Sequence, residues 1–268
     1  MGVESMRFSL LGSGSAGNAI LVTTPTGKLL IDNGLSYKQL AKRAALIGES
    51  LEDLRAVLVT HEHGDHVNGL GVLSRKCQVP IYITRATFEN LPKNIGALES
   101  LNFFDSGDTF SIDSFSINTF RIAHDAADPV SFVIEHNGCR MGLATDLGSV
   151  SNLVRQRLKD CHALILESNY CHDMIRNSPY PPQIIQRIRS NHGHLSNVDM
   201  NKLLAELLHD DLRLVVAMHV SKENNTEEKV EYMARNVLKN HPASFFIADQ
   251  ENPSPMINIM DHGRERIQ

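Results

Sequence analysis

The sequence contains no pair of cysteines at the CxxC spacing that is typical of a zinc knuckle. Its four cysteines lie far apart in the chain, at Cys77, Cys139, Cys161 and Cys171. Scattered cysteines with no secretory signal ahead of them indicate reduced thiols in a cytosolic protein. We therefore expect no cysteine-rich structural zinc site.

The sequence also lacks any long apolar run. Its first residues, MGVESMRFSLLGSG, do not combine a basic region with an apolar stretch long enough for a secretory signal. Met6 stands where a myristoylation site has Ser or Thr. No later stretch approaches the roughly 18 apolar residues that span a membrane. We expect a soluble, cytoplasmic chain with no membrane partner.

A strong net charge is absent as well. The chain has 31 acidic and 26 basic residues, which gives a formal net charge of −5. This balance provides no overall attraction for a polyanion, so any phosphate binding must be produced locally. The charge therefore neither supports nor excludes a nucleic-acid substrate.

The apolar pattern predicts strands first and helices later. Four early apolar runs have the length of strands: 7–12, 19–24, 28–34 and 56–61. Residues 36–48 have helical periodicity, with Ser36 as the N-cap and Gly48 as the stop. The middle of the chain is rich in strands, and residues 136–138 carry the Asn-Gly signature of a tight hairpin. From residue 149 onward, helices alternate with strands.

This order of elements predicts one α/β domain in which two sheets pack face to face with helices outside. We expect that domain to occupy residues 1–248 of the 268-residue chain. The remaining residues, 249–268, are polar and contain prolines. We expect them to form a loosely held C-terminal tail.

The segment THEHGDHVNG, residues 60–69, gathers four polar side chains directly after an apolar run: His61, His63, Asp65 and His66. A short loop at a strand end can aim several side chains at one point, because the sheet fixes its base. Imidazoles suit zinc and similar metals, and a carboxylate among them admits harder ions such as Mn²⁺. A solvated turn would explain one lone histidine, but this spacing predicts a metal site.

The histidine-rich segment resembles the signature of the metallo-β-lactamase superfamily. That superfamily also places an Asp before the cluster and a His, an Asp and a His after it, each at the end of a strand. This chain offers all four in order: Asp32, His124, Asp146 and His219. The resemblance implies a four-layer αββα sandwich with a metal site in the cleft at the strand ends.

The resemblance further implies a hydrolase with two divalent metal ions, zinc or manganese, with iron or magnesium also admitted. One metal would be held by His61, His63 and His124. The other would be held by Asp65, His66 and His219. Asp146 would bridge the two, Asp32 would orient the cluster through hydrogen bonds, and Asp65 would also act on the attacking water. Asp146 stands where true β-lactamases have Cys, and His63 stands where the di-iron oxidoreductases have Glu, so both branches are disfavoured.

Two residues in the second half of the chain resemble the Glu and His of ribonuclease Z-like enzymes, a resemblance that implies a phosphodiester substrate. Glu167 ends the run ALILE, and His194 lies in the turn NHGHLSN, where Ser196 also fits a helix N-cap. A carboxylate that holds an imidazole suits general acid catalysis. With the metal motifs, these blocks resemble the YycJ/WalJ-type single-domain nucleases over roughly residues 7–248. That resemblance implies a 5′-to-3′ exonuclease on single-stranded DNA or RNA ends.

Two other functions remain open. A small cyclic phosphodiester, phosphoribosyl or nucleotide, is the nearest alternative substrate. A non-catalytic metal-binding regulatory module is an alternative of another class, and it predicts gaps among the ligands that the sequence does not show. The sequence predicts neither the native metal nor the oligomeric state.

Several polar residues are candidates for contact with the substrate: Ser221, Asn224, Asn225 and Arg187. A polar helix entry is an equally good account of the first three. Arg176 and Arg189 are further phosphate candidates, although solvated helix charges are the competing account for these arginines. We also expect Asn18, in GSGSAGN, to tie loops together near the metal centre.

Overall fold

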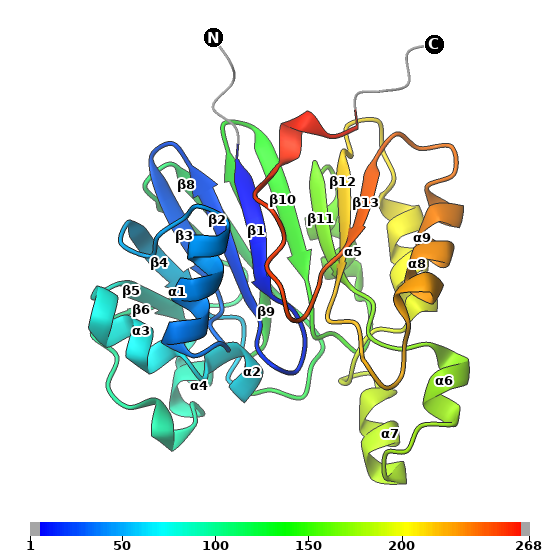
Figure 1. Ribbon diagram of the computed structural model, residues 1–268, viewed down its shortest axis with the longest axis horizontal. Helices are drawn as coiled ribbons and strands as arrows, with labels where there is room; N and C mark the ends of the chain where they lie inside the picture. Colours follow the sequence, from blue (N-terminus) through cyan, green and yellow to red (C-terminus); the bar gives the residue numbers. More distant parts are fainter. Residues whose placement is uncertain (1–5, 264–268) are drawn as a thin grey trace.

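The computed structural model describes residues 6–263, which form two β-sheets packed face to face (Figure 1). Sheet A contains, in spatial order, β14 (Ile257–Asn258), β1 (Arg7–Gly12), β2 (Ala19–Thr24), β3 (Gly27–Ile31), β4 (Leu54–Leu58), β5 (Pro80–Ile83) and β6 (Ser100–Phe103). Sheet B contains, in spatial order, β13 (Ser244–Ile247), β12 (Leu214–Met218), β11 (Ala163–Glu167), β10 (Cys139–Ala144), β9 (Val130–His136), β8 (Phe115–Arg121) and β7 (Thr109–Ile112).

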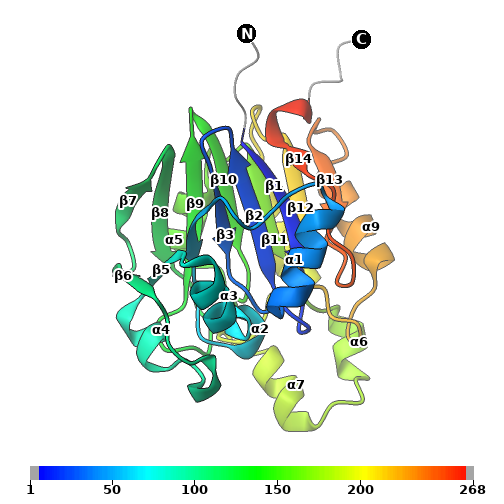
Figure 2. The same ribbon diagram turned by 60° about the vertical axis from the view of Figure 1, so that its left-hand side comes forward.

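Helices cover the outer face of each sheet. Sheet A is covered by α1 (Tyr37–Leu46) and α3 (Leu70–Cys77), and sheet B by α5 (Asn152–Leu158), α8 (Asn197–Leu207) and α9 (Glu227–Val237). Shorter helices lie along the lower edge in Figures 1 and 2: α2 (Gly64–Val67), α4 (Arg85–Glu89), α6 (His172–Arg176) and α7 (Pro182–Ile188). Two 3-10 turns span Lys93–Ile95 and Ile259–Asp261. Between residues 6 and 263, no helix is long and apolar enough to cross a membrane.

Three separate apolar clusters show why the four layers hold together. The central cluster joins the facing sides of the two sheets, with Phe8 from sheet A and Phe132 from sheet B both fully buried. A second cluster packs α5, α8 and α9 on sheet B, and a third packs α1 and α3 on sheet A. Each sheet is therefore apolar on both faces, and the predicted αββα sandwich is confirmed.

The early strands follow the predicted pattern closely. The runs 7–12 and 19–24 coincide with β1 and β2, and α1 begins after Ser36, whose side chain accepts a hydrogen bond from the backbone N–H of Gln39. By contrast, β3 ends at Ile31 and β4 ends at Leu58, a few residues before the predicted ends. The residues beyond these ends leave the sheet and carry polar side chains toward the candidate site.

The C-terminal segment differs from the expected loose tail. In the described part of that tail, β14 pairs antiparallel with β1, and the backbone N–H of Leu10 donates to the hydroxyl of Ser254. Ile257 and Ile259 belong to the central apolar cluster. The β14 strand thus covers the edge that β1 would otherwise leave open, and its neighbouring side chains join the core, so residues 249–263 pack as part of the domain. Residues 264–268 of the expected tail lie outside the described residues.

Candidate metal centre

The residues predicted to bind metal come together at the edge of the sandwich where α2 lies (Figure 1). They follow the ends of strands in both sheets. Two of them, Asp146 and His219, and the orienting residue Asp32 have positive φ angles of 56°, 54° and 58°. A left-handed backbone is unfavourable for residues other than glycine, and such strain collects at functional sites. This conformation turns each side chain sharply out of its strand and into the centre.

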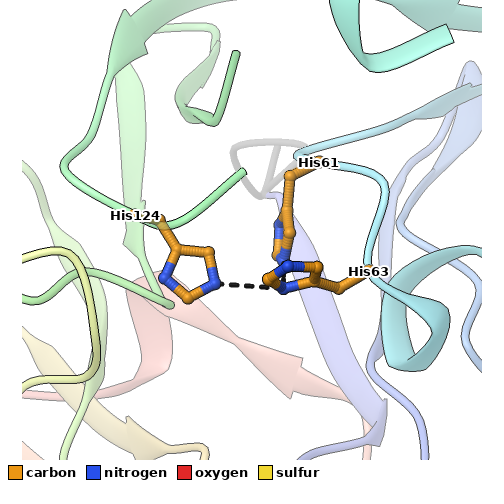
Figure 3. Close-up of side chains that lie close together, drawn as sticks. All are labelled: His61, His63 and His124. Carbon is orange, nitrogen blue, oxygen red and sulfur yellow. Dashed lines mark hydrogen bonds between the residues drawn. The ribbon is translucent and has the colours of Figure 1, made fainter. Parts of the chain in front are cut away.

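Three histidines form the first cluster (Figure 3). The Nε2 atom of His61 lies 3.1 Å from Nδ1 of His63, and Nε2 of His124 lies 3.2 Å from the same Nδ1 atom. His61 and His63 come from the loop after β4, whereas His124 comes from the loop after β8. The three rings therefore direct one nitrogen each toward a common point, as three ligands of one metal ion do.

Two carboxylates and two histidines form the second cluster. The Nε2 atom of His66 lies 3.5 Å from Oδ2 of Asp65 and 3.3 Å from Oδ2 of Asp146. The Nε2 atom of His219 lies 3.5 Å from Asp65 Oδ2 and 3.5 Å from Asp146 Oδ1. Asp146 also groups with His61 of the first cluster. Its buried carboxylate thus stands between the two clusters, where the bridging ligand was expected.

Hydrogen bonds behind the clusters fix how the rings point. Asp32 Oδ2 accepts from Nδ1 of His66 at 2.8 Å and from the hydroxyl of Thr60 at 2.7 Å. The oxygen of that hydroxyl lies 3.0 Å from Nδ1 of His61 and accepts from it. One carboxylate therefore orients a histidine of each cluster, directly or through Thr60. Thr60 was missed in the sequence, where its position directly before the first histidine is the only signal.

Two further histidines are oriented from the other half of the chain. Nδ1 of His124 donates to the backbone carbonyl of Gly193 at 3.0 Å. Nδ1 of His219 lies 3.2 Å from Oε1 of Glu167, which is fully buried. A proton on Nδ1 leaves the lone pair on Nε2 free, and His61, His66, His124 and His219 share this arrangement. The donor set therefore fits divalent metal ions on a property of the rings themselves.

Glu167 is also the partner of His194. Its Oε1 lies 2.7 Å from Nδ1 of His194, and its Oε2 accepts from the backbone N–H groups of Leu147 and Leu195, each at 3.0 Å. Burial lowers the pKa of His194, but the carboxylate of Glu167 and its hydrogen bond outweigh burial and raise it. The His194 ring stacks 5.1 Å from that of His219. An imidazole whose charged form is favoured by Glu167 thus stands beside the second cluster.

Burial and neighbouring charge shift the pKa values of histidines in the two clusters in opposite directions. Burial lowers the pKa of His61 well below its ordinary value and also lowers the pKa of His124. Burial is the largest single influence on His66 and His219 too and opposes their charge, but the surrounding carboxylates, Asp146 foremost, together outweigh it and raise the pKa of both well above the ordinary value. Burial likewise opposes charge on Asp65, yet hydrogen bonds from His219 and His66 lower its pKa.

Asn18 ties three loops together, as expected. Its side-chain amide donates to Oδ2 of Asp65 at 3.1 Å, and its Oδ1 accepts from the backbone N–H of Gly14 at 2.7 Å. Its backbone N–H donates to the carbonyl of Asp65, and its carbonyl accepts from Gly34. A side chain at Gly34 would collide with the backbone of Asp65, so the loops pass each other at close range.

Two of the residues predicted to contact the substrate, Asn225 and Ser221, form hydrogen bonds within the protein. Asn225 is 3% exposed, and its amide donates to the carbonyls of Ser168 and Asn169 while its Oδ1 accepts from Asn197. Because a buried amide must be satisfied, Asn225 is a structural residue and that prediction is corrected. Ser221 uses its hydroxyl to accept from the backbone N–H of Asn224.

Asn224 is buried, whereas the side chain of Arg187 is 56% exposed and pairs with a carboxylate. Asn224 is 1% exposed, and its amide has no hydrogen-bond partner within the described residues. Arg187 forms an ion pair with Asp125, whose other oxygen lies 3.4 Å from Nε2 of His124. Asp125 was missed in the sequence, although it directly follows a predicted ligand. The partner of Arg187 is thus a carboxylate beside the first cluster.

Comparison with known proteins gives this arrangement a context. The Beta-lactamase superfamily domain matches residues 28–220 of the chain. Exodeoxyribonuclease YycJ of Bacillus anthracis is 36% identical over 239 residues, which cover 87% of this chain and 89% of that protein. Exodeoxyribonuclease WalJ of Streptococcus pneumoniae is 34% identical over 226 residues, covering 83% of this chain and 84% of that protein.

A solved structure shares the fold at much lower identity. The metallo-beta-lactamase fold protein YhfI from Bacillus subtilis superimposes with a TM-score of 0.73 at 19% identity, over 93% of this chain and 99% of that one. This likeness supports the sandwich, and the sequence relatives support the closer kinship. The chain therefore belongs to the metallo-β-lactamase superfamily and, within it, to the family of YycJ and WalJ.

Proposed function

We propose that this metal-dependent hydrolase cleaves phosphodiester bonds in DNA, removing nucleotides in the 5′-to-3′ direction from single-stranded ends, with RNA ends as a second substrate. The observation that carries the proposal is the Glu167–His194 pair beside Asp146 and His219. An alkoxide leaving group needs a proton, and a protonated imidazole held by a buried carboxylate supplies one. A thiolate, the leaving group of thioester hydrolysis, leaves without one.

The side chains divide the work between two metal positions. His61, His63 and His124 would hold one divalent ion, Asp65, His66 and His219 would hold a second, and Asp146 would touch both. Bound there, zinc or manganese would polarise the phosphoryl group and make the attacking water more acidic. Asp65 would orient that water, since its carboxylate reaches both His66 and His219. His194 would donate its proton to the leaving oxygen.

The substrate class rests on kinship as well as geometry. YycJ and WalJ are named exodeoxyribonucleases, and each match covers more than four fifths of both chains. A nucleic-acid substrate also agrees with a reaction in the cytoplasm, which we propose as its location. No observation on the described residues favours a cyclic diester or a regulatory role without catalysis.

A product time course tests the proposal. Single-stranded DNA and RNA labelled at either end are incubated with the chain and Mn²⁺ or Zn²⁺. A mononucleotide released from the 5′ end at the earliest times supports it. Mononucleotides that appear first from the 3′ end would overturn the direction. Turnover of a cyclic nucleotide without degradation of either strand would overturn the substrate, and no hydrolysis by a metal-loaded chain would overturn the catalytic role.

A further inference from the structure

A pocket of about 600 Å³ adjoins the metal centre on the side of sheet B. It lies between the loop that follows β8 and the start of α5, and its lining includes His124 and His192. His124 directs its Nε2 atom toward His63 in the first cluster. His192 stands two residues before His194, the proposed proton donor. The pocket therefore meets the candidate centre at His124, whose ring lies 5.4 Å from that of His194.

The lining has the chemistry that a nucleotide requires. Ile122, Pro129 and Leu153 give it apolar walls, and Leu153 is 40% exposed at its rim. Arg121 contributes a guanidinium whose nearest carboxylate, that of Asp128, is 3.8 Å away. No carboxylate is present among the residues that line the pocket. Apolar walls with a cation suit a base and a phosphate, and the volume lies in the range of small-ligand sites.

The place of the pocket relative to His194 selects the occupant. If His194 protonates the leaving oxygen, the nucleotide that departs with that oxygen lies on the same side of the phosphorus as His194. We propose that this pocket holds the 5′-terminal nucleotide of the strand during cleavage; the inference rests on the proposed function.

The step is the hydrolysis of one phosphodiester bond. Water adds to phosphorus and releases a proton, the bond from phosphorus to O3′ of the terminal nucleotide breaks, and O3′ takes a proton from His194, which the proton released by the water replaces. The phosphate stays on the next nucleotide, and the freed nucleotide leaves from the pocket. Because the pocket has room for one nucleotide, release should occur one nucleotide at a time.

Binding of deoxyadenosine monophosphate, measured by isothermal titration calorimetry, tests this without turnover. The variant is Leu153→Asp, which places a negative charge at the rim. We expect its affinity for the nucleotide to be at least about tenfold weaker than that of the wild type, because like charges repel across an interface. Leu46→Asp is the matched control, since Leu46 is 65% exposed on α1, over the other sheet. It should bind as the wild type does.

A second pair of variants separates base from phosphate. Arg121→Ala should weaken binding of the nucleotide by about tenfold while leaving that of deoxyadenosine unchanged, since only the former carries the phosphate. Arg55→Ala, an exposed arginine of sheet A that pairs with Asp113, should change neither. The chain has no tryptophan, so Leu153→Trp also provides a single fluorescent reporter. Its emission should change saturably with the nucleotide, whereas that of Leu46→Trp should not.

Each titration is run with the metal-loaded chain and again after chelation. Binding that survives chelation and is weakened by Leu153→Asp supports the pocket. Equal affinity in all variants, binding that disappears entirely on chelation, or no binding at all would overturn it. These outcomes are independent of the time course: a chain that degrades DNA with an indifferent Leu153→Asp retains its function and loses only the pocket.

Discussion

The two clusters of the candidate centre share an edge of the sandwich but differ in charge. The first, His61, His63 and His124, has no carboxylate, and burial keeps the pKa of His61 and His124 low. The second contains Asp65 and Asp146. The first cluster thus offers imidazole nitrogens, whereas the second is a mixed set of oxygens and nitrogens. One edge of the sandwich can therefore offer a softer and a harder site, suited to different metal ions.

Loss of Asp146 should have the largest effect, because its carboxylate stands between the two clusters and serves both. We expect Asp146→Ala to reduce phosphodiester hydrolysis by more than about 10⁴-fold, beyond what loss of a positioned general acid costs. Metal content per chain, measured by mass spectrometry after dialysis, should fall at both positions. His63→Ala is the comparison variant and should lose metal at one position only. An Asp146→Ala chain that retains all its metal would contradict the bridging role.

His194→Ala should have the next largest effect and spare the metals. We expect its rate on single-stranded DNA to fall by about 10²- to 10³-fold, the contribution of a general acid. The loss should be smaller on bis(p-nitrophenyl) phosphate, whose leaving group needs little protonation. His172→Ala, in the short helix α6, is the control with an unchanged rate. Equal losses on both substrates would show that His194 acts through the fold or the metals instead.

Asp32→Asn should separate the two clusters in metal affinity. Asp32 accepts directly from His66 of the second cluster but reaches His61 only through Thr60. We expect metal at the second position to bind about 10- to 100-fold more weakly, as for other residues that orient ligands. Asp113→Asn is a close control, since Asp113 also has a positive φ, of 49°, and lies in an exposed turn. Its metal affinity should match that of the wild type.

The smallest expected effect is a difference between the two clusters in the pH dependence of metal loading. The carboxylates raise the pKa of His66 and His219 in the metal-free chain, so protons compete with metal there up to a higher pH. At His61 and His124 the pKa is lowered, so protons compete only in more acidic solution. As pH falls, the second position should therefore empty before the first. Metal per chain after dialysis at stepwise lower pH should show two separate losses, and one common midpoint would contradict this.

The sequence predicted those parts of the centre that follow from local patterns. Asp32, Asp146 and His219 each close an apolar run, so their position at a strand end could be inferred from the run itself. No pattern in the sequence predicts which distant segments come into contact. The hydrogen bond from His124 to the carbonyl of Gly193 and the ion pair of Arg187 with Asp125 join residues more than sixty positions apart.

Burial explains the predictions that were corrected. Asn225 looks like a free polar residue in the sequence, but the loops around it enclose its amide, which then bonds to their carbonyls. The polar composition of residues 249–268 likewise hid Ile257 and Ile259, which complete an apolar core built by both sheets. The composition of a segment does not predict which surface that segment packs against.

The left-handed backbone at Asp32, Asp146 and His219 has a consequence for how metal enters. Residues held in sparsely populated conformations cost of order 1–3 kcal/mol each, and that strain is accepted when the chain folds. The ligands Asp146 and His219 and the orienting residue Asp32 are therefore aimed before any ion arrives, and loading requires loss of protons and water rather than movement of the main chain. Metal entry should accordingly be fast, with little change in heat capacity, because it buries almost no new apolar surface.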